Sequence, residues 1–283
     1  MSEDFLAAMA QASRERVVHA SAQLPMRELQ AQAAALAPPP PLRLSQAGFD
    51  LIAEVKLRSP AAGQLRQASE NIGARVASYA DAGAAAISVL TEPSRFDGAL
   101  SHLTLAAHGL GGRIPVMRKD FLVDPYQVYE ARLAGAGGVL LILRMLGRAE
   151  NEALLEAAAG LGLFALLEAF DAADLRLAAE LVGSYAGRAA LLVGVNCRDL
   201  VTLKVVPGRL EALAPLLPGN VPRVAESGVE TGVDAARVAA HGYDLALVGS
   251  ALMQAVDPLA LAAGMLRAGR DAASGRAAAG GRA

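Results

Sequence analysis

The sequence predicts an α/β fold, a single (β/α)8 TIM barrel with an N-terminal helical extension and a short C-terminal tail. Three observations lead to this prediction. Short apolar runs alternate with longer amphipathic runs. Hydrophobic residues make up 54% of the 283 residues and charged residues 19%, which supports one large buried core. The number of strand candidates and their even spacing favour a closed barrel over an open doubly wound sheet, although both would produce the alternation.

The two ends of the chain are predicted to lie outside the barrel. Residues 1–37 have apolar side chains at near-helical spacing and are expected to be helical; these side chains are Phe5, Leu6, Met9, Val17 and Leu24. Pro38 to Pro41 end this helix and act as a stiff connector. Asp271 to Ala283 has no apolar period, and we expect a frayed tail. The predicted divisions are 1–47 for the extension, 48–268 for the barrel and 269–283 for a flexible tail.

Eight apolar runs between these ends are the predicted strands. They are residues 49–55, 85–90, 114–118, 138–142, 163–168, 190–195, 222–225 and 244–248. Helix-compatible segments between them include 70–82, 124–134, 148–160, 171–182 and 231–241. Helix-start signals support two of these, since Asp124 precedes Pro125 and Thr231 precedes an acidic first turn. Because the strands are almost continuously apolar, the sheet is expected to be parallel and covered on both faces.

Charge and cysteine content exclude several classes of function. The formal net charge is −2, and no basic run exceeds a pair, so no nucleic-acid or membrane partner is expected. One cysteine and four scattered histidines predict no internal disulfide and no metal cluster. Glu3 and Asp4 stand where a signal peptide would carry positive charge, and the longest apolar stretch is too short to span a bilayer. A cytoplasmic protein is expected, either a monomer or a weak homodimer.

Polar side chains stand at the carboxyl ends of five predicted strands. In the first strand, alternation places Ile52, Glu54 and Lys56 on one face, so that a carboxylate and an ammonium group point into the barrel mouth. The other four strands end in Lys119, Glu168, Asn196 and Glu226. Each residue alone is equally well explained as a solvated strand end or a structural ion pair. Together they predict an active site, because barrel enzymes place their active sites at this rim.

Two Gly-Ser pairings after the last two strands predict a phosphate site. Ser227-Gly228 follows the seventh strand, and Gly249-Ser250 follows the eighth, directly before a short helical segment. Glycine allows close approach of the backbone, and a helix N-terminus presents N–H groups to an anion. Each pair alone is typical of an ordinary turn. Their position in the barrel is where phosphate groups are commonly held.

Six runs resemble the indole-3-glycerol phosphate synthase family. They are IAEVKLRSP (52–60), ISVLTEPSRFDG (87–98), PVMRKDFLVDPYQVYEARLAGA (115–136), VGVNCRDL (193–200), VAESGV (224–229) and LVGSALM (247–253). The resemblance covers about 48–268, and RKDF followed by DPYQ is its most specific part. It implies an enzyme that closes 1-(2-carboxyphenylamino)-1-deoxyribulose 5-phosphate to the indole product with loss of CO2 and water, without metal or organic cofactor. The implied partner is therefore an anionic small molecule with a carboxylate and a phosphate.

The resemblance also implies a role for each site residue. Lys119 is similar to the general acid that protonates the ketone, and Glu168 to the acid/base group of the later proton transfers. Lys56 is similar to the second lysine, oriented by Glu54, which meets the substrate carboxylate. Asn196 and Glu226 resemble groups that bind sugar hydroxyls and hold the lysines. The phosphate side comprises Arg198, Ser227, Gly228, Gly249 and Ser250; Ser59 lies on a mobile first loop, and Pro60, Phe96 and Phe121 form apolar walls.

The chain departs from the family pattern at three places. Ala61 and Ala62 stand where the family usually has a serine and a lysine, which puts gating by the first loop in question. Ala169 and Phe170 replace a common valine and histidine. Cys197 replaces a frequent asparagine, and it has no adjacent histidine to activate a thiolate.

Three alternatives to the synthase remain open at this point. Phosphoribosylanthranilate isomerase uses a Cys/Asp pair at strand ends, whereas the first strand here ends in Glu-x-Lys. A catalytically silent barrel would have lost part of the set Lys56, Lys119 and Glu168, all of which are present. A paralogue that serves a secondary pathway is compatible with the altered first loop.

Overall fold

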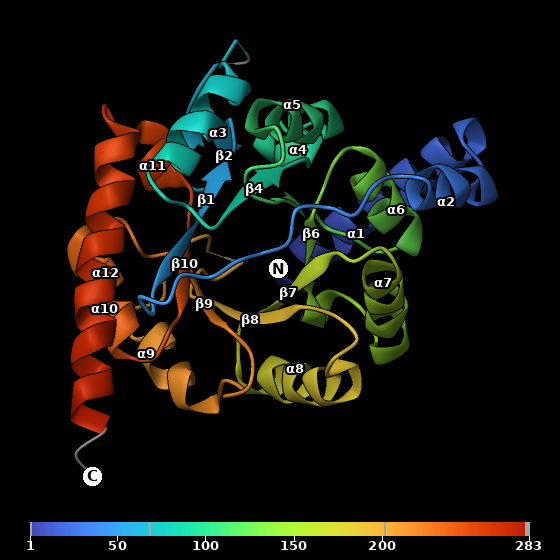
Figure 1. The fold of residues 1–283 in the computed structure, drawn as a ribbon. Helices are drawn as coiled ribbons and strands as arrows, with labels where there is room; N and C mark the ends of the chain where they lie inside the picture. The colour runs from blue at the N-terminus through green and yellow to red at the C-terminus, as the bar shows by residue number, and fades with distance from the viewer. Residues whose placement is uncertain (1, 68, 201, 281–283) are drawn as a thin grey trace.

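Eight parallel strands close into a barrel in the spatial order β1-β10-β9-β8-β7-β6-β5-β4 (Figure 1). The computed structural model describes residues 2–67, 69–200 and 202–280. The barrel strands are β1 (Asp50–Val55), β4 (Ala86–Leu90), β5 (Val116–Lys119), β6 (Gly138–Ile142), β7 (Phe164–Ala169), β8 (Leu191–Asn196), β9 (Arg223–Glu226) and β10 (Leu245–Val248). β2 (Arg58–Ser59) and β3 (Gly63–Gln64) form a separate antiparallel hairpin. The predicted barrel is confirmed.

Alternation along the strands produces two distinct cores. In β1, Ile52 belongs to a cluster inside the barrel, together with residues such as Met117 and Leu166. Its neighbours Leu51 and Ala53 belong to the larger cluster between the strands and the helices. Because both faces of each strand are buried, the strands read as continuous apolar runs in the sequence.

Helices surround the barrel (Figure 1). They are α3 (Ile72–Asp81), α4 (Pro93–Phe96), α5 (Leu100–Leu110), α6 (Pro125–Leu133), α7 (Arg148–Gly160), α8 (Ala172–Tyr185), α9 (Arg209–Leu213), α10 (Gly232–Ala240), α11 (Ser250–Gln254) and α12 (Pro258–Gly280), with short 3-10 turns at Leu143–Met145 and Ala214–Leu216. The predicted caps are present: Asp124 accepts the Tyr126 N–H at 2.8 Å, and Thr231 forms a capping box with Asp234.

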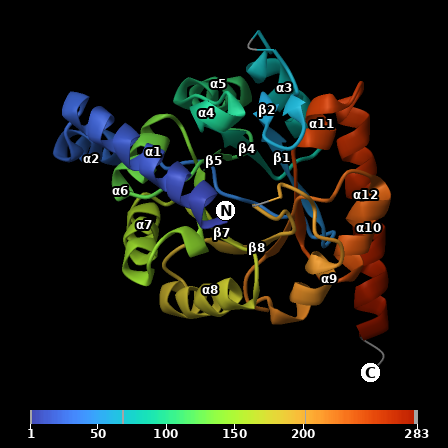
Figure 2. The same cartoon turned by 180° about the vertical axis from the view of Figure 1, so that it is seen from behind.

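The N-terminal extension consists of two helices rather than the single predicted one. α1 (Ser2–Gln23) ends before Pro25, and α2 (Met26–Ala34) begins after it. Proline lacks the N–H that a continuous helix needs, and here the Pro25 carbonyl accepts the N–H groups of Glu28 and Leu29 as the start of α2. Figure 2 shows α1 crossing in front of the barrel, with its first turns over the barrel centre.

The predicted frayed tail is helical as far as Gly280. α12 runs past residue 269 because this segment has specific partners on the barrel side. Arg270 donates to the Phe49 carbonyl at 3.1 Å and pairs with Asp50 at 2.9 Å. Gly269 lies against the Phe49 ring, where a Cβ would come within 2.1 Å of a ring carbon. The prediction of a frayed tail from the missing apolar period is therefore wrong for this segment, because contacts to residues distant in sequence hold the helix.

Candidate active site

One pocket at the carboxyl ends of the strands contains every predicted site residue. Its empty space, including the part that is open to solvent, is about 1060 Å³. Its lining includes Glu54, Lys56, Ser59, Pro60, Phe96, Lys119, Phe121, Glu168, Asn196, Arg198, Glu226, Ser227, Gly228, Gly249 and Ser250. Because all eight strands run in parallel, their carboxyl ends meet at one rim, and residues distant in sequence converge there.

Three carboxyl groups and two ammonium groups form a charged cluster in this pocket. Lys56 Nζ lies 2.6 Å from Glu54 Oε1. Lys119 Nζ lies 3.3 Å from Glu226 Oε2 and 3.6 Å from Glu168 Oε1. All three carboxyl side chains are almost fully buried, whereas the lysine side chains keep 14% and 18% exposure toward the pocket. The cations are therefore the groups that a ligand entering the pocket can reach.

Opposing effects act on the pKa of Lys119. Burial lowers this pKa, but the carboxylates of Glu168, Glu226 and Glu54 raise it by more, so the net shift is upward. Lys119 is consequently an ammonium ion at neutral pH. It is a proton donor that releases its proton only to a strongly basic oxygen.

The pKa of Glu226 is also raised, but here burial drives the rise. Burial, joined by repulsion from Glu168, raises the pKa of Glu226 to about 8, although the Lys119 ammonium opposes the rise. Glu226 Oε1 is buried and has no hydrogen-bond partner among the described residues. A buried, unpartnered oxygen favours the neutral carboxyl group. The cluster therefore holds a second exchangeable proton next to Lys119 near neutral pH.

Asn196 fixes the position of Glu168. Its Nδ2 donates to Glu168 Oε1 at 2.6 Å, and its Oδ1 accepts the Arg198 N–H at 2.9 Å. The Arg198 guanidinium donates to the Leu203 carbonyl at 2.6 Å while the residue also lines the pocket. One amide side chain thus ties the end of β8 to the neighbouring strand and to the loop that follows.

Two glycines make room for the buried carboxyl groups. A Cβ on Gly249 would lie 2.1 Å from Glu54 Oε1, and a Cβ on Gly194 would lie 2.2 Å from Glu226 Oε1. Gly249 was predicted on the phosphate side, and the structure adds this contact with the Glu54–Lys56 pair. Gly194 was not predicted. A glycine within an apolar strand is a signal of close approach and would have identified it.

The predicted phosphate residues line the pocket after the adjacent strands β9 and β10. Ser227 and Gly228 follow β9 with φ values of 65° and 67°, a left-handed turn that is unusual for serine. After the adjacent strand β10, Gly249 is the N-cap residue of α11 and Ser250 is the first residue of that helix. These residues line the same pocket as the charged cluster.

Aromatic side chains form an apolar side of the pocket. Phe121 lies 6.3 Å from Phe96 and 5.9 Å from Phe5, measured between ring centroids. Phe5 of α1 and Phe170 after β7 also line the pocket, and neither was assigned to the site from the sequence. Alternation from Glu168 points to Phe170, whereas the helical pattern around Phe5 carries no signal of where α1 packs.

The first loop folds as the β2–β3 hairpin, which brings Ser59, Pro60 and Ala61 to the pocket.

Cys197 is buried, and burial raises the pKa of its thiol, as expected of a packing residue. Within residues 2–67, 69–200 and 202–280, no group of three His, Cys, Asp or Glu side chains is arranged to hold a metal ion. No helix in that part of the chain is long and apolar enough to cross a membrane.

Comparison with known proteins identifies related sequences. A family model described as indole-3-glycerol phosphate synthase matches residues 6–263. The synthase of Mycobacterium avium (strain 104) is 42% identical over 245 residues, 84% of this chain and 85% of the relative. That of Mycolicibacterium smegmatis (strain ATCC 700084 / mc(2)155) is 43% identical, over 83% and 84%. That of Mycobacterium tuberculosis (strain CDC 1551 / Oshkosh) is 41% identical, over 84% and 85%.

Solved structures of more distant proteins share the fold. Thiamine phosphate pyrophosphorylase from Pyrococcus furiosus has a TM-score of 0.58 at 18% identity, covering 80% of this chain and 98% of that one. 3-Hexulose-6-phosphate synthase from Salmonella typhimurium has a TM-score of 0.59 at 16% identity, covering 80% and 99%. At these identities the likeness concerns the barrel alone.

Proposed function

Because the chain belongs to the indole-3-glycerol phosphate synthase family, it is a carboxy-lyase of tryptophan biosynthesis, and we propose that the pocket at the barrel rim carries out its reaction. In that reaction, 1-(2-carboxyphenylamino)-1-deoxyribulose 5-phosphate closes to indole-3-glycerol phosphate with loss of CO2 and water. The proposal concerns which residues bind this substrate and which move its protons.

The pocket offers donors for both anionic groups of the substrate. We place the phosphate at Ser227, Gly228, Gly249 and Ser250, with Arg198 beside them, since backbone N–H groups and a guanidinium are typical phosphate donors. We place the substrate carboxylate near Lys56, whose ammonium reaches the pocket while Glu54 orients it. The aromatic ring then lies between Pro60, Phe96 and Phe121.

Ring closure requires a proton on the ketone oxygen. The ring carbon that bears the carboxylate attacks the ketone carbon, a C–C bond forms, and the oxygen takes a proton. Lys119 is the proposed donor, because its raised pKa keeps it protonated until an alkoxide develops. Loss of CO2 then restores the aromatic ring.

Dehydration requires both a donor and an acceptor. The hydroxyl group formed from the ketone leaves as water after protonation, and a proton is lost from the neighbouring carbon. Glu168 is the proposed acid/base group for these transfers, since Asn196 holds it 3.6 Å from the Lys119 nitrogen. Glu226, at 3.3 Å from the same nitrogen, orients Lys119 and binds the sugar hydroxyls.

The observation that carries the proposal is the contact of Lys119 with two buried carboxyl groups at the mouth of the pocket. The experiment is conversion of the substrate by purified protein, followed by indole fluorescence. The chain contains no Trp, so background emission from the protein is low. We expect product without added metal and no inhibition by a chelator. Absence of product at micromolar enzyme would contradict the proposal.

A further inference from the structure

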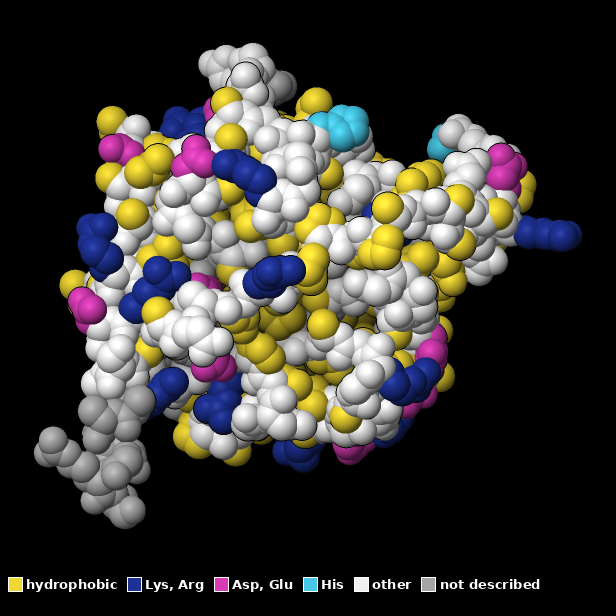
Figure 3. Space-filling model, viewed as in Figure 1, with side chains coloured by type: hydrophobic (Ala, Val, Ile, Leu, Met, Phe, Trp, Pro, Cys, Tyr) yellow, Lys and Arg dark blue, Asp and Glu magenta, His cyan; other side chains and the backbone are white. Residues whose placement is uncertain are grey.

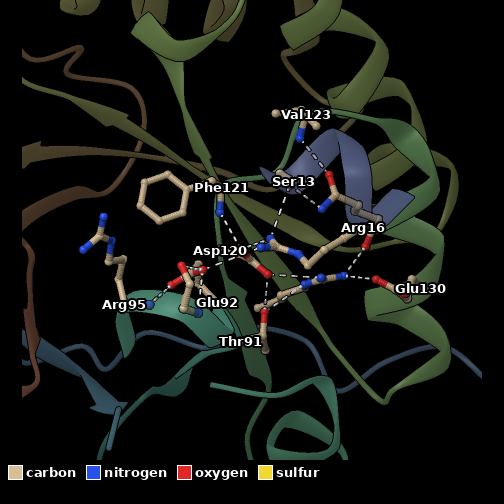
Figure 4. Close-up of polar contacts among 12 residues, drawn as sticks. Ser13, Arg16, Thr91, Glu92, Arg95, Asp120, Phe121, Val123 and Glu130 are labelled. Atoms are coloured by element: carbon tan, nitrogen blue, oxygen red, sulfur yellow. Dashed lines mark hydrogen bonds and ion pairs between the residues drawn. The ribbon is translucent and has the colours of Figure 1, made fainter. Parts of the chain in front are cut away.

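A polar cluster lies between helix α1 and the ends of β4 and β5, next to Phe121 (Figure 4), and its member Asp120 also lines the pocket. We call it the α1–β5 cluster; it comprises Ser13, Arg16, Thr91, Glu92, Arg118, Asp120, Gln127 and Glu130. None of these residues has a role in the proposed chemistry. Their contacts nevertheless end on residues that do.

Asp120 is the centre of the cluster. Its Oδ1 accepts from Arg16 Nη2 at 2.7 Å and from the Phe121 N–H at 2.8 Å. Its Oδ2 accepts from Thr91 Oγ at 2.7 Å and from Arg118 Nη2 at 3.2 Å. Asp120 stands between Lys119 and Phe121 in the chain and is only 3% exposed. A shift of this carboxylate would therefore loosen its hydrogen bond to the Phe121 N–H, in the backbone that carries both pocket residues.

Arg118 anchors the same strand end from the side opposite to Lys119. Alternation points it out of the barrel, where it donates to Glu130 at 2.6 Å and to the Gln127 carbonyl at 3.0 Å. Gln127 in turn donates to Ser13 of α1 at 2.8 Å and accepts the Val123 N–H. The strand end is thus held from α6 and from α1 together.

Arg16 also reaches the carboxylate that positions the second aromatic wall. Its Nη1 lies 3.7 Å from Glu92 Oε1. Glu92 caps α4 by accepting the N–H groups of Ser94 and Arg95 at 2.8 and 2.7 Å. α4 ends at Phe96. One guanidinium therefore contacts the carboxylate that precedes Phe121 and the carboxylate that caps the helix ending at Phe96.

Removing the Arg16 guanidinium would take a positive charge away from two buried carboxylates. The Glu92 and Asp120 side chains are each 1% exposed, and both approach the Arg16 side chain, which is 29% exposed. Without Arg16, Asp120 keeps Arg118 at 3.2 Å as its cation, so its carboxylate is drawn toward Arg118 and away from the Phe121 side. Movement of Asp120 would release the Phe121 N–H and loosen the Lys119 backbone.

On these contacts, and resting on the proposed function of the pocket, we propose that Arg16 is a positioning residue that aligns Lys119 and Phe121 through Asp120. Helix α1 then contributes to catalysis through this ion pair as well as by placing Phe5 over the pocket. Arg16 does not touch the reacting atoms. Its effect passes through the backbone at the end of β5.

The test compares Arg16→Met with Arg14→Met, which removes a charge from an exposed position of the same helix. We expect Arg16→Met to lower kcat about tenfold, because small displacements of a catalytic group are costly. Amide hydrogen exchange at residues 119–123 should become faster. Arg14→Met should leave both quantities at the wild-type value, and Arg16→Lys should recover part of kcat because it keeps the charge.

A double-mutant cycle with Asp120→Asn tests the route of the effect. If Arg16 acts through Asp120, Arg16→Met should change kcat less than about twofold in the Asp120→Asn background. A tenfold loss in that background would overturn the proposal. So would wild-type kcat and wild-type exchange at Phe121 in Arg16→Met, even if its melting temperature fell. An inactive wild-type enzyme would contradict the proposed function instead, since the exchange measurement does not depend on activity.

Discussion

At the scale of single residues, the pocket depends on the difference between lysine and arginine. The chain contains three lysines, Lys56, Lys119 and Lys204, among its 26 basic residues. Two of the three line the pocket, while arginines make most of the ion pairs elsewhere. Arginine keeps its proton at any working pH, whereas a lysine can donate one and recover it. For Lys119, the proposed proton donor, the choice of lysine is therefore a chemical requirement and not a requirement for charge alone.

Lys119→Ala tests the proposed proton donor. It should lower kcat at least about a hundredfold, which is the scale of lost general acid catalysis. Steady-state indole fluorescence at saturating substrate measures this effect. Lys204→Ala, which removes an exposed lysine outside the pocket, is the matched control and should retain wild-type kcat. A loss below about tenfold in Lys119→Ala would show that another group protonates the ketone.

At the scale of elements, five of the eight barrel strands bring a polar side chain to the pocket, and the segments after β8 and β9 add further lining residues. β8 ends in Asn196 and continues into Arg198, and β9 ends in Glu226 and continues into the left-handed turn at Ser227. In the proposed mechanism, the strand ends hold the proton-transfer groups, and the loops after them bind the anionic groups of the substrate. This difference between strands and loops follows from the barrel, because a strand cannot change position without breaking its hydrogen bonds to the neighbouring strands.

Ser250→Asp tests the phosphate end at the start of α11. A new carboxylate beside the substrate phosphate should raise KM at least about tenfold through like-charge repulsion. kcat should fall much less, because Lys119 and Glu168 stand on other strands. Initial-rate measurements over a range of substrate concentrations separate the two constants. Ser101→Asp, at an exposed position of α5, controls for the added charge. Equal effects on kcat and KM would place the phosphate elsewhere.

At the scale of the whole molecule, both chain ends are attached to the barrel and the surface charge is mixed. α1 lines the pocket through Phe5 and is bound to Asp120 through Arg16, and α12 is bound to β1 through Arg270. On the face shown in Figure 3, basic and acidic side chains are interspersed, in agreement with the net charge of −2. The cluster of opposed charges is instead concentrated inside the pocket, where it affects the stability of the entire fold.

Glu226→Gln tests this effect through the pH dependence of unfolding. The pKa of Glu226 rises from an ordinary 4.5 to about 8 on folding, so the folded chain binds this proton more tightly than the unfolded chain. The associated stability is complete below about pH 4.5 and is lost as the pH rises through about 8. Glutamine cannot titrate, so the free energy of unfolding of the variant should decline less between pH 5 and 9 than that of the wild type.

Urea denaturation across about pH 5 to 9 measures this difference. Glu15→Gln, which removes a carboxylate from an exposed position of α1, serves as the control. Parallel pH profiles for the wild type and Glu226→Gln would show that Glu226 ionises in the folded protein as readily as in the unfolded chain.

The sequence by itself determined the strand order along the chain, the barrel and the set of side chains at its rim. Apolar alternation and helix-start residues are local signals, and parallel closure brings every carboxyl strand end to one side. Contacts between distant segments were decided only by the tertiary structure. Arg16 meets Asp120 across 104 positions, and Arg270 holds α12 against β1 where a frayed tail was expected. Neither contact appears as a periodic pattern in the sequence, because each depends on how a terminal helix packs against the closed barrel.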